Sequence, residues 1–227
     1  MRQISVFVLV FSLMYSLAHS LFAQPKVERA MIEQGLVDVQ KIDPTIKVEL
    51  KYSTTDNFVG KDVYGDLTRA YMQPMAARKL ADASKYLQTH HPELRLLVYD
   101  AARPRSAQWN LWNALPNLSE RERRKYVADP RQGSIHNYGC AVDLTVATKD
   151  GEPLDMGTKY DYFGELAYPS RENELLRAGK LTQKQLDNRQ ILRTAMRQGG
   201  FSSIEYEWWH FNALSRAKAK MAFRIVD

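Results

Sequence analysis

The sequence has a single cysteine, Cys140, among its 227 residues. One thiol cannot form a disulfide within the chain, so the fold must depend on a hydrophobic core, which a chain of this length is able to bury. After residue 25 there is no apolar run long enough to span a membrane. The sequence also lacks internal repeats, low-complexity segments and linkers rich in glycine or proline. These absences favour one domain.

Charge is plentiful but is not segregated along the chain. The net charge is +6 at pH 7, with 26% charged and 44% hydrophobic residues, which is ordinary for a globular protein. Lysine and arginine alternate with acids, as in residues 120–125, and this pattern is typical of a solvated helix face. Basic residues do not recur together with aromatic ones, so we expect no nucleic-acid partner. No pattern specifies the oligomeric state.

The first two dozen residues have the composition of an export signal. Arg2 precedes an uncharged apolar run over residues 4–18. Small residues then provide two candidate cleavage sites, one ending at Ser20 and one ending at Ala23. No cysteine lies near them, so processing as a lipoprotein is not expected.

We therefore predict a signal peptide at residues 1–23 and a mature domain at residues 24–227. The protein is expected to be exported, to the periplasm, without a membrane span after cleavage. The alternative is an uncleaved membrane anchor, because residues 3–25 carry no charge and are almost long enough to span a bilayer.

Hydrophobic periodicity and capping residues predict a mixture of helices and strands. The predicted strands cover residues 46–52, 94–99, 140–148 and 201–210. The predicted helices cover part of residues 24–38, residues 74–89, a segment that opens at Pro104, a charged segment capped by Ser119 and Glu122, and a segment capped by Thr182 that ends at Gly199. Strands that pair as hairpins rather than in βαβ units indicate an α+β fold, with a small central antiparallel sheet flanked by helices in a single domain.

Two segments bring together side chains that bind metals. Residues 134–143 read Ser-Ile-His-Asn-Tyr-Gly-Cys-Ala-Val-Asp, and residues 207–210 read Glu-Trp-Trp-His. Together they offer His136, Asp143 and His210 as ligands. Two imidazoles and one carboxylate suit Zn²⁺, with a fourth position left open for water. We therefore predict one catalytic zinc per chain.

Glu207 is the candidate general base beside this metal. Residues three apart face opposite sides of a straight strand, so Glu207 and His210 converge only if the chain bends or enters a loop. Trp208 and Trp209 would shield the metal from bulk water. Cys140 is an alternative zinc ligand, although a small buried residue at the start of a strand is the favoured interpretation.

The same residues carry a family resemblance. The pattern Ser-x-His-x-x-Gly-x-Ala-x-Asp, followed by Glu-x-x-His, resembles the zinc D-Ala-D-Ala peptidases, a group related in fold to the hedgehog amino-terminal domain and the lysostaphin-type peptidases. Within this group the chain is most similar to the VanX-type D-alanyl-D-alanine dipeptidases. The resemblance extends from about Val39 to Phe211. Three further segments carry it, at residues 52–60, 99–104 and 155–161.

The resemblance implies zinc-dependent hydrolysis of D-alanyl-D-alanine to two D-alanines. Glu207 would move the proton, and Arg103 would stabilise the oxyanion together with the metal. The alternative for Arg103 is a surface salt bridge to Asp100. Preference for D-configured residues follows from the resemblance alone.

The resemblance also implies residues for the two charged ends of a free dipeptide. Asp161, assisted by the Tyr52 hydroxyl, would bind the ammonium group, with Asp155 as the alternative acid. Ser134 would donate to the terminal carboxylate. Tyr64 is expected near the pocket wall, without an assigned role.

Three other functions stay open. A zinc D,D-carboxypeptidase would act on longer wall peptides, an endopeptidase or amidase would share the fold, and a non-catalytic zinc protein would only bind wall peptides. The predicted export also bears on physiology. Relatives that protect against glycopeptide antibiotics deplete a cytoplasmic dipeptide pool, which an exported enzyme does not reach, so we expect a role in cell-wall turnover or scavenging.

Overall fold

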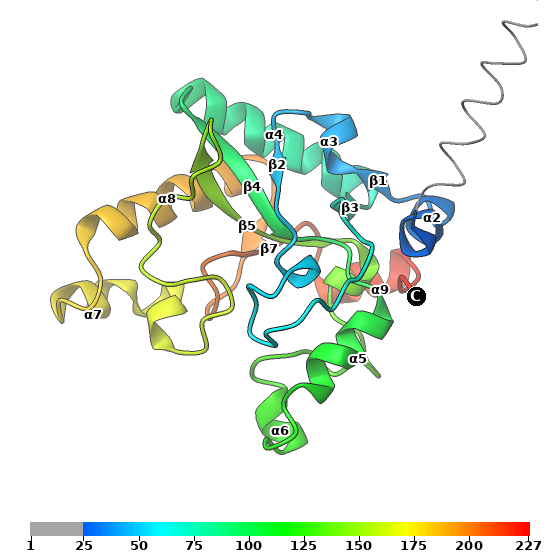
Figure 1. Cartoon of the computed structure of the whole chain (residues 1–227). Coiled ribbons are helices and arrows are strands. Elements are labelled where there is room, and N and C mark those ends of the chain that lie inside the picture. Colours follow the sequence, from blue (N-terminus) through cyan, green and yellow to red (C-terminus); the bar gives the residue numbers. More distant parts are fainter. Residues whose placement is uncertain (1–24) are drawn as a thin grey trace, which may run out of the picture.

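The computed structural model describes residues 25–227 (Figure 1). The predicted signal peptide at residues 1–23 lies outside the described residues. The helices of the described part are α2 (Lys26–Glu33), α3 (Val39–Ile42), α4 (Pro74–His90), α5 (Arg105–Asn113), α6 (Glu120–Arg123), α7 (Glu172–Arg177), α8 (Gln183–Gln198) and α9 (Arg216–Ala222). The strands are β1 (Val37–Asp38), β2 (Lys47–Val48), β3 (Tyr71–Met72), β4 (Leu94–Asp100), β5 (Ala141–Thr148), β6 (Ser202–Ser203) and β7 (His210–Asn212). Short 3₁₀ turns are η1 (Lys51–Ser53), η2 (His136–Tyr138), η3 (Glu165–Ala167) and η4 (Pro169–Arg171).

A central five-stranded sheet confirms the predicted α+β class. Its strand order is β2-β4-β5-β7-β6, and every neighbouring pair is antiparallel except β2 and β4. The parallel pair was not expected from the sequence. It forms because α4 lies between β2 and β4 in the chain and provides the crossover that parallel strands require. A separate two-stranded sheet pairs β1 with β3.

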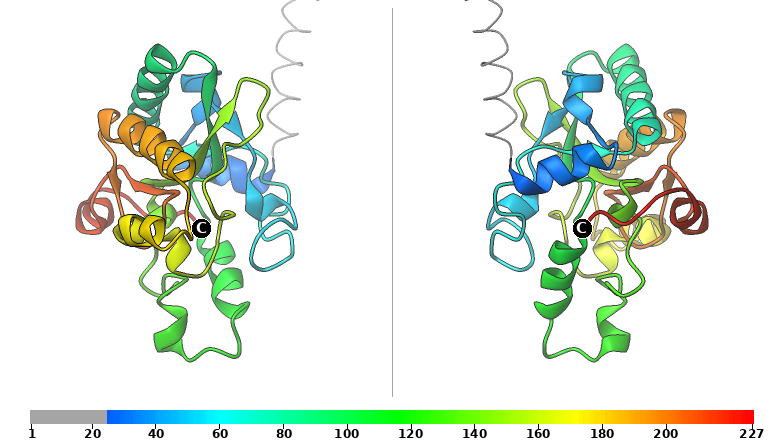
Figure 2. Two further views of the ribbon diagram at one scale, coloured as in Figure 1. Left: turned by 90° about the vertical axis from the view of Figure 1, so that its left-hand side faces the viewer. Right: turned by 90° about the vertical axis from the view of Figure 1, so that its right-hand side faces the viewer.

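Helices α4 and α8 pack against each other and cover one face of the sheet (Figure 1, Figure 2). Alternate residues of β5, namely Val142, Leu144 and Val146, point into the main hydrophobic core on this side. The predicted caps hold these helices, because Pro74 occupies the first turn of α4 and Thr182 forms a capping box with Gln185 at the start of α8.

The opposite face of the sheet is also buried, and it carries polar side chains. On β5 this face presents Asp143 and Thr145, which are 3% and 1% exposed. The segment of residues 153–164 packs over it, and Tyr160 contacts the small cluster of Leu97, Tyr99 and Ala147. This second face therefore provides a sheltered polar environment for a functional site.

Two predicted strands are shorter than the sequence pattern indicates. Residues 46–52 alternate like a strand, but only Lys47 and Val48 pair with β4, and the chain then turns into η1. The strand predicted at residues 201–210 is replaced by the short strand β6, a loop, and then β7, which begins only at His210. Glu207 lies in this loop, which is the departure from a straight strand that the spacing of Glu207 and His210 requires.

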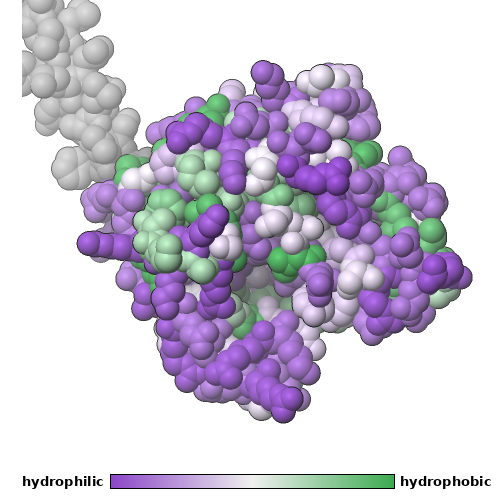
Figure 3. Space-filling view, turned by 180° about the vertical axis from the view of Figure 1, so that it is seen from behind, coloured by the Kyte–Doolittle hydropathy of each residue, from purple (hydrophilic) through white to green (hydrophobic). Residues whose placement is uncertain are grey.

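The charged segment near residue 120 is solvent-exposed, as the alternating pattern predicts. Ser119 and Glu122 form the predicted capping box of α6. Two basic side chains of this region form ion pairs, since Arg131 contacts Glu120 and Arg124 contacts Asp129. The part of the surface formed around α5 and α6, at the bottom of Figure 3, is strongly hydrophilic. Within residues 25–227 no helix is both long and apolar enough to cross a membrane.

Candidate metal centre and substrate pocket

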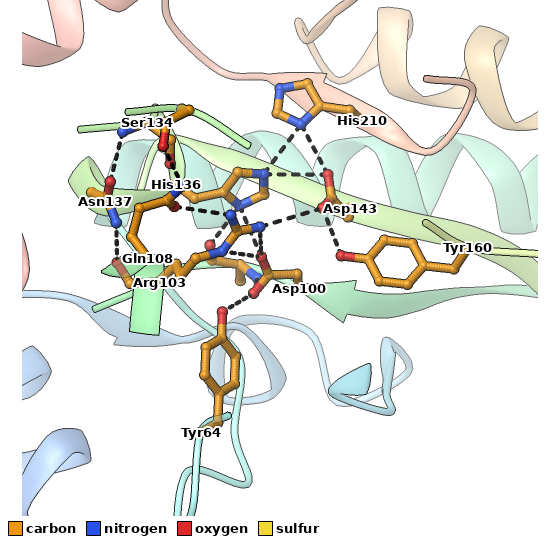
Figure 4. A network of polar contacts seen from close by, with 12 residues as sticks. Tyr64, Asp100, Arg103, Gln108, Ser134, His136, Asn137, Asp143, Tyr160 and His210 are labelled. Carbon is orange, nitrogen blue, oxygen red and sulfur yellow. Dashed lines mark hydrogen bonds and ion pairs between the residues drawn. The ribbon is translucent and has the colours of Figure 1, made fainter. Parts of the chain in front are cut away.

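The three predicted metal ligands converge on the second face of the sheet (Figure 4). Asp143 on β5 lies opposite His210 on β7 in the antiparallel register, and His136 comes from η2, directly before β5. Asp143 Oδ1 lies 2.9 Å from His210 Nδ1 and 3.3 Å from His136 Nε2. The two imidazole nitrogens are 3.1 Å apart. Ligand atoms around a tetrahedral zinc, each about 2.1 Å from the metal, are separated by roughly 3.4 Å, so this group fits the ion.

A glycine after His136 sets the direction of the first ligand. Gly139 has a φ of 65°, in the left-handed region that glycine adopts without steric cost. A Cβ atom there would lie 3.0 Å from the Leu36 side chain and 3.2 Å from the backbone nitrogen of Gln73. The turn therefore requires glycine both for its conformation and for the close approach of a neighbouring segment.

Each candidate ligand has a second polar partner that orients it. His136 Nδ1 lies 2.8 Å from the carbonyl oxygen of Ala101, which leaves Nε2 for the metal. His210 Nε2 lies 2.9 Å from Asn212 Oδ1, which leaves Nδ1 for the metal. The Tyr160 hydroxyl donates to Asp143 Oδ2 over 3.0 Å. Orienting contacts of this kind are common around protein-bound zinc.

Cys140 does not belong to the metal group. It is fully buried beside Tyr138 and Ala219, and its thiol contacts the carbonyl oxygen of Tyr138. Burial raises the pKa of the Cys140 thiol to about 12, against a smaller opposing effect of Lys79. The neutral thiol is an inert packing group, in agreement with the favoured interpretation.

Glu207 lies beside the group of His136, Asp143 and His210 and is not a member of it. Its Oε2 is 3.9 Å from His210 Nδ1, and the carboxylate lines the same cavity as the three ligands. Burial raises the pKa of the Glu207 carboxyl, His210 opposes this shift, and the negative charge of Asp143 adds to it. A carboxyl with a raised pKa next to a metal is suited to accepting and returning a proton.

Arg103 is both an ion-pair partner and a wall of the cavity. Its Nε and Nη2 donate to Asp100 Oδ2 at 3.0 and 2.5 Å, and its Nη1 donates to Gln108 Oε1 over 3.0 Å. The predicted alternative, a salt bridge to Asp100, is thus present, but it is buried rather than superficial. Burial acts to lower the pKa of Arg103, but Asp100 and the surrounding tyrosines together outweigh it and raise the pKa well above its ordinary value, so Arg103 stays cationic.

Tyr64 contacts Arg103 indirectly, through Asp100. Its hydroxyl donates to the second carboxylate oxygen of Asp100, and Asp100 is fully buried. We expected Tyr64 near the pocket wall. In the structure it does not line the cavity, and Asp100 lies between Tyr64 and the metal group (Figure 4). Gln108, which also holds the guanidinium group of Arg103, was not identified from the sequence, because its approach depends on the turn between β4 and α5.

The cavity beside the metal group is small, with a volume of about 120 Å³. It is lined by Tyr52, Arg103, Leu111, Tyr126, Val127, Ala128, Ser134, His136, Asp143, Asp161, Glu207, Trp209 and His210. Sites for drug-sized ligands are typically several hundred Å³. The cavity therefore suits a much smaller molecule.

Two polar atoms of this cavity lack a hydrogen-bond partner within the described chain, Ser134 Oγ and Asp161 Oδ2. Buried polar atoms without a partner are uncommon, and because these two line the cavity, a bound molecule or water is a suitable partner for them. Asp161 has a φ of 58°, and it is the single non-glycine residue of positive φ in residues 25–227. Burial raises the pKa of the Asp161 carboxyl well above its ordinary value, and the charge of Asp143 adds to this.

Asp155, the alternative acid, lies elsewhere. Its oxygens accept hydrogen bonds from the backbone of Gly157 and from the Gln185 side chain, and it lines a different cavity of about 430 Å³. Tyr52, by contrast, lines the small cavity, where the guanidinium carbon of Arg103 lies 5.1 Å from the centre of its ring. The geometry thus brings Asp161 and Tyr52 into the candidate site and leaves Asp155 out of it.

Known proteins resemble this chain in sequence. Residues 32–226 match a protein family described as D-ala-D-ala dipeptidase. A D-alanyl-D-alanine dipeptidase of Escherichia coli is 36% identical over 78% of this chain and 83% of its own length. Enzymes of the same name from Enterococcus faecalis and Enterococcus faecium are 29% and 30% identical, over 81% and 79% of this chain and 93% and 92% of their own lengths. The chain therefore belongs to the D-ala-D-ala dipeptidase family of zinc metallopeptidases.

Proposed function

We propose that this protein hydrolyses the free dipeptide D-alanyl-D-alanine to two D-alanines, with zinc held by His136, Asp143 and His210. The observation that carries the proposal is one small cavity that contains the metal group together with a carboxylate oxygen and a hydroxyl, neither of which has a hydrogen-bond partner within residues 25–227. The names of the relatives support the choice of substrate.

The two unpaired atoms match the two charges of a free dipeptide. Asp161 binds the substrate ammonium, with the Tyr52 hydroxyl beside it, and Ser134 donates to the terminal carboxylate. In Figure 4 the metal group lies between Ser134 and Tyr160, the residue that precedes Asp161. A dipeptide that spans the metal would pair both of its ends, and pairing with the ammonium would restore the charged form of Asp161.

The chemical step is assigned to two residues beside the metal. A bound zinc supplies Lewis-acid polarisation of the scissile carbonyl and a lowered pKa of water. Glu207 takes a proton from the water whose oxygen attacks the carbonyl carbon, and returns it to the nitrogen as the C–N bond breaks. Arg103 stabilises the negative charge on the carbonyl oxygen with a guanidinium already held in place by Asp100 and Gln108.

The direct test is D-alanine release from D-Ala-D-Ala by the purified protein, which is assayed untreated, after removal of metal with a chelator, and after restoration with zinc. An N-acylated dipeptide is assayed in parallel. We expect zinc-dependent release from the free dipeptide alone. Cleavage of the acylated dipeptide would identify a carboxypeptidase, and zinc binding without any release would identify a binding protein.

Substitution of Asp161 separates a dipeptidase from the alternatives. Asp161→Asn removes the carboxylate charge, so kcat/KM for the free dipeptide should fall by roughly 10- to 100-fold, the value of a hydrogen bond to a charged group. Asp155→Asn is the matched control, since Asp155 lies outside the small cavity, and it should leave kcat/KM close to that of the wild type. Equal effects of the two substitutions would contradict the assignment of Asp161.

Export is the remaining part of the proposal. The composition of residues 1–23 supports a cleaved signal peptide, with residues 24–227 as the mature catalytic domain. An exported enzyme would act on dipeptide released during turnover of the cell wall. Fractionation of cells, followed by N-terminal sequencing of the mature protein, tests this. Enzyme found mainly in the cytoplasm would contradict it and would favour a role in antibiotic resistance.

A further inference from the structure

The two oxygens of Asp143 have different surroundings. Oδ1 faces the two histidine nitrogens of the metal group. Oδ2 points away from them and accepts a hydrogen bond from the Tyr160 hydroxyl over 3.0 Å. The next polar group is Arg103 Nη2, which lies 3.9 Å from Oδ2 and is too far away for a hydrogen bond. Within the described chain, Tyr160 therefore makes the single hydrogen bond to this oxygen.

The direction of this hydrogen bond is fixed by chemistry. A carboxylate only accepts, and a tyrosine hydroxyl is protonated near neutral pH. The hydroxyl is also held in place, because the Tyr160 ring packs against three other aromatic rings. Its centroid lies 6.0 Å from that of Tyr52, 5.4 Å from that of Tyr99 and 5.5 Å from that of Trp209.

We propose that Tyr160 is a positioning residue of the metal centre, which holds Asp143 with Oδ1 toward the metal and Oδ2 away from it. The inference rests on the metal site proposed above. It gives Asp143 the same kind of support that His136 receives from the carbonyl of Ala101 and that His210 receives from Asn212. All three ligands then have an orienting partner outside the metal group.

The Tyr160 hydroxyl also keeps Asp143 away from Arg103. Without it, rotation of the carboxylate would bring Oδ2 toward the guanidinium, and both oxygens would become available to the metal. The first change would draw Arg103 from Asp100, and both changes would alter the coordination geometry. In addition, Tyr160 directly precedes Asp161, so one short segment supports the metal ligand and carries the proposed ammonium-binding residue.

The test is the zinc affinity of Tyr160→Phe, measured by competition with a chromophoric chelator. This substitution removes the hydroxyl and retains the ring. The matched control is Tyr99→Phe, which removes a hydroxyl from the same aromatic cluster; no hydrogen bond from Tyr99 to the metal group is found within residues 25–227. We expect the dissociation constant for zinc to rise by roughly 10- to 100-fold in Tyr160→Phe, as when such orienting partners are lost elsewhere, and to be little changed in Tyr99→Phe.

The visible spectrum of the cobalt-substituted protein provides a second measurement. Its ligand-field bands should shift in Tyr160→Phe and stay in place in Tyr99→Phe, because only the first alters the ligand geometry. A purely structural role of Tyr160 would instead lower the thermal stability of metal-free Tyr160→Phe and leave its zinc affinity unchanged, and that result overturns the inference. If the wild-type protein fails to bind zinc, the metal site itself is wrong and the inference falls with it.

Discussion

The carboxylate of Glu207 is separated from the metal group by a short gap, with its Oε2 3.9 Å from His210 Nδ1. Replacement by glutamine keeps the shape of the side chain and removes its capacity to carry a proton. We expect Glu207→Gln to bind zinc normally and to lose roughly 10²- to 10⁴-fold in kcat, the usual contribution of a general acid-base residue. Steady-state kinetics combined with metal analysis check this. Loss of zinc from the variant would show that Glu207 is a ligand instead.

The contribution of Arg103 to catalysis is expected to depend on the arrangement of its guanidinium N–H donors as well as on its charge. Lysine keeps the charge but cannot contact Asp100 and Gln108 in the same geometry. Arg103→Lys should therefore lower kcat by roughly 10²- to 10³-fold. The control is Arg105→Lys, because Arg105 is partly exposed and pairs with Asp227. Similar kcat values for Arg103→Lys and the wild type would show that charge alone is sufficient.

At the scale of the elements, η2 is the turn that delivers His136, and its conformation depends on Gly139. An alanine there meets an unfavourable φ of 65° and two contacts of 3.0 and 3.2 Å. We expect Gly139→Ala to destabilise the fold by about 1–3 kcal/mol and to weaken zinc binding, as measured by chemical unfolding and chelator competition. The control is Gly60→Ala, which has a φ of 67° but no atom within 4 Å of the added Cβ. Equal destabilisation in both variants would show that the contacts at Gly139 have no effect.

The longer elements were predictable because their sequence signals are local. The apolar run of β4, the caps of α4 and α8, and the strand after Gly139 agree with the structure to within a few residues. The short strands were overestimated. Residues 46–52 alternate correctly, but only β4 offers them a partner, and pairing ends after Val48. The length of a strand depends on the neighbouring strand with which it pairs, and the alternation of residues along one segment does not show where that partner ends.

The same distinction applies to the site. His136, Asp143, His210 and Glu207 follow from side-chain chemistry and spacing, together with the family resemblance. The groups that orient them do not. Tyr160 and Asn212 carry no sequence signal for such a role, because their contacts depend on how residues 153–164 cross the sheet and on the register between β5 and β7.

At the scale of the whole molecule, the metal joins parts of the fold that are distant in sequence. The proposed ligands belong to η2, β5 and β7, so a zinc bound to them stabilises the folded state over the unfolded chain. At a free zinc concentration of 100 times the dissociation constant this amounts to about 2.7 kcal/mol. We expect removal of zinc to lower Tm by roughly 5–10 °C in a domain of this size. Calorimetry checks this, with His210→Ala as the control, whose Tm should not respond to the chelator.

The thiol of Cys140 can report on local unfolding near the proposed metal centre. It is the one thiol of the chain, it is fully buried, and it lies between two proposed zinc ligands. A thiol reagent reaches such a group only when the surrounding structure opens, so the rate of labelling measures how often the region between His136 and Asp143 unfolds. Labelling should be slow in the zinc-bound protein and faster after chelation. The rate of local unfolding at the metal centre can thus be measured in the unmodified enzyme, without an introduced probe.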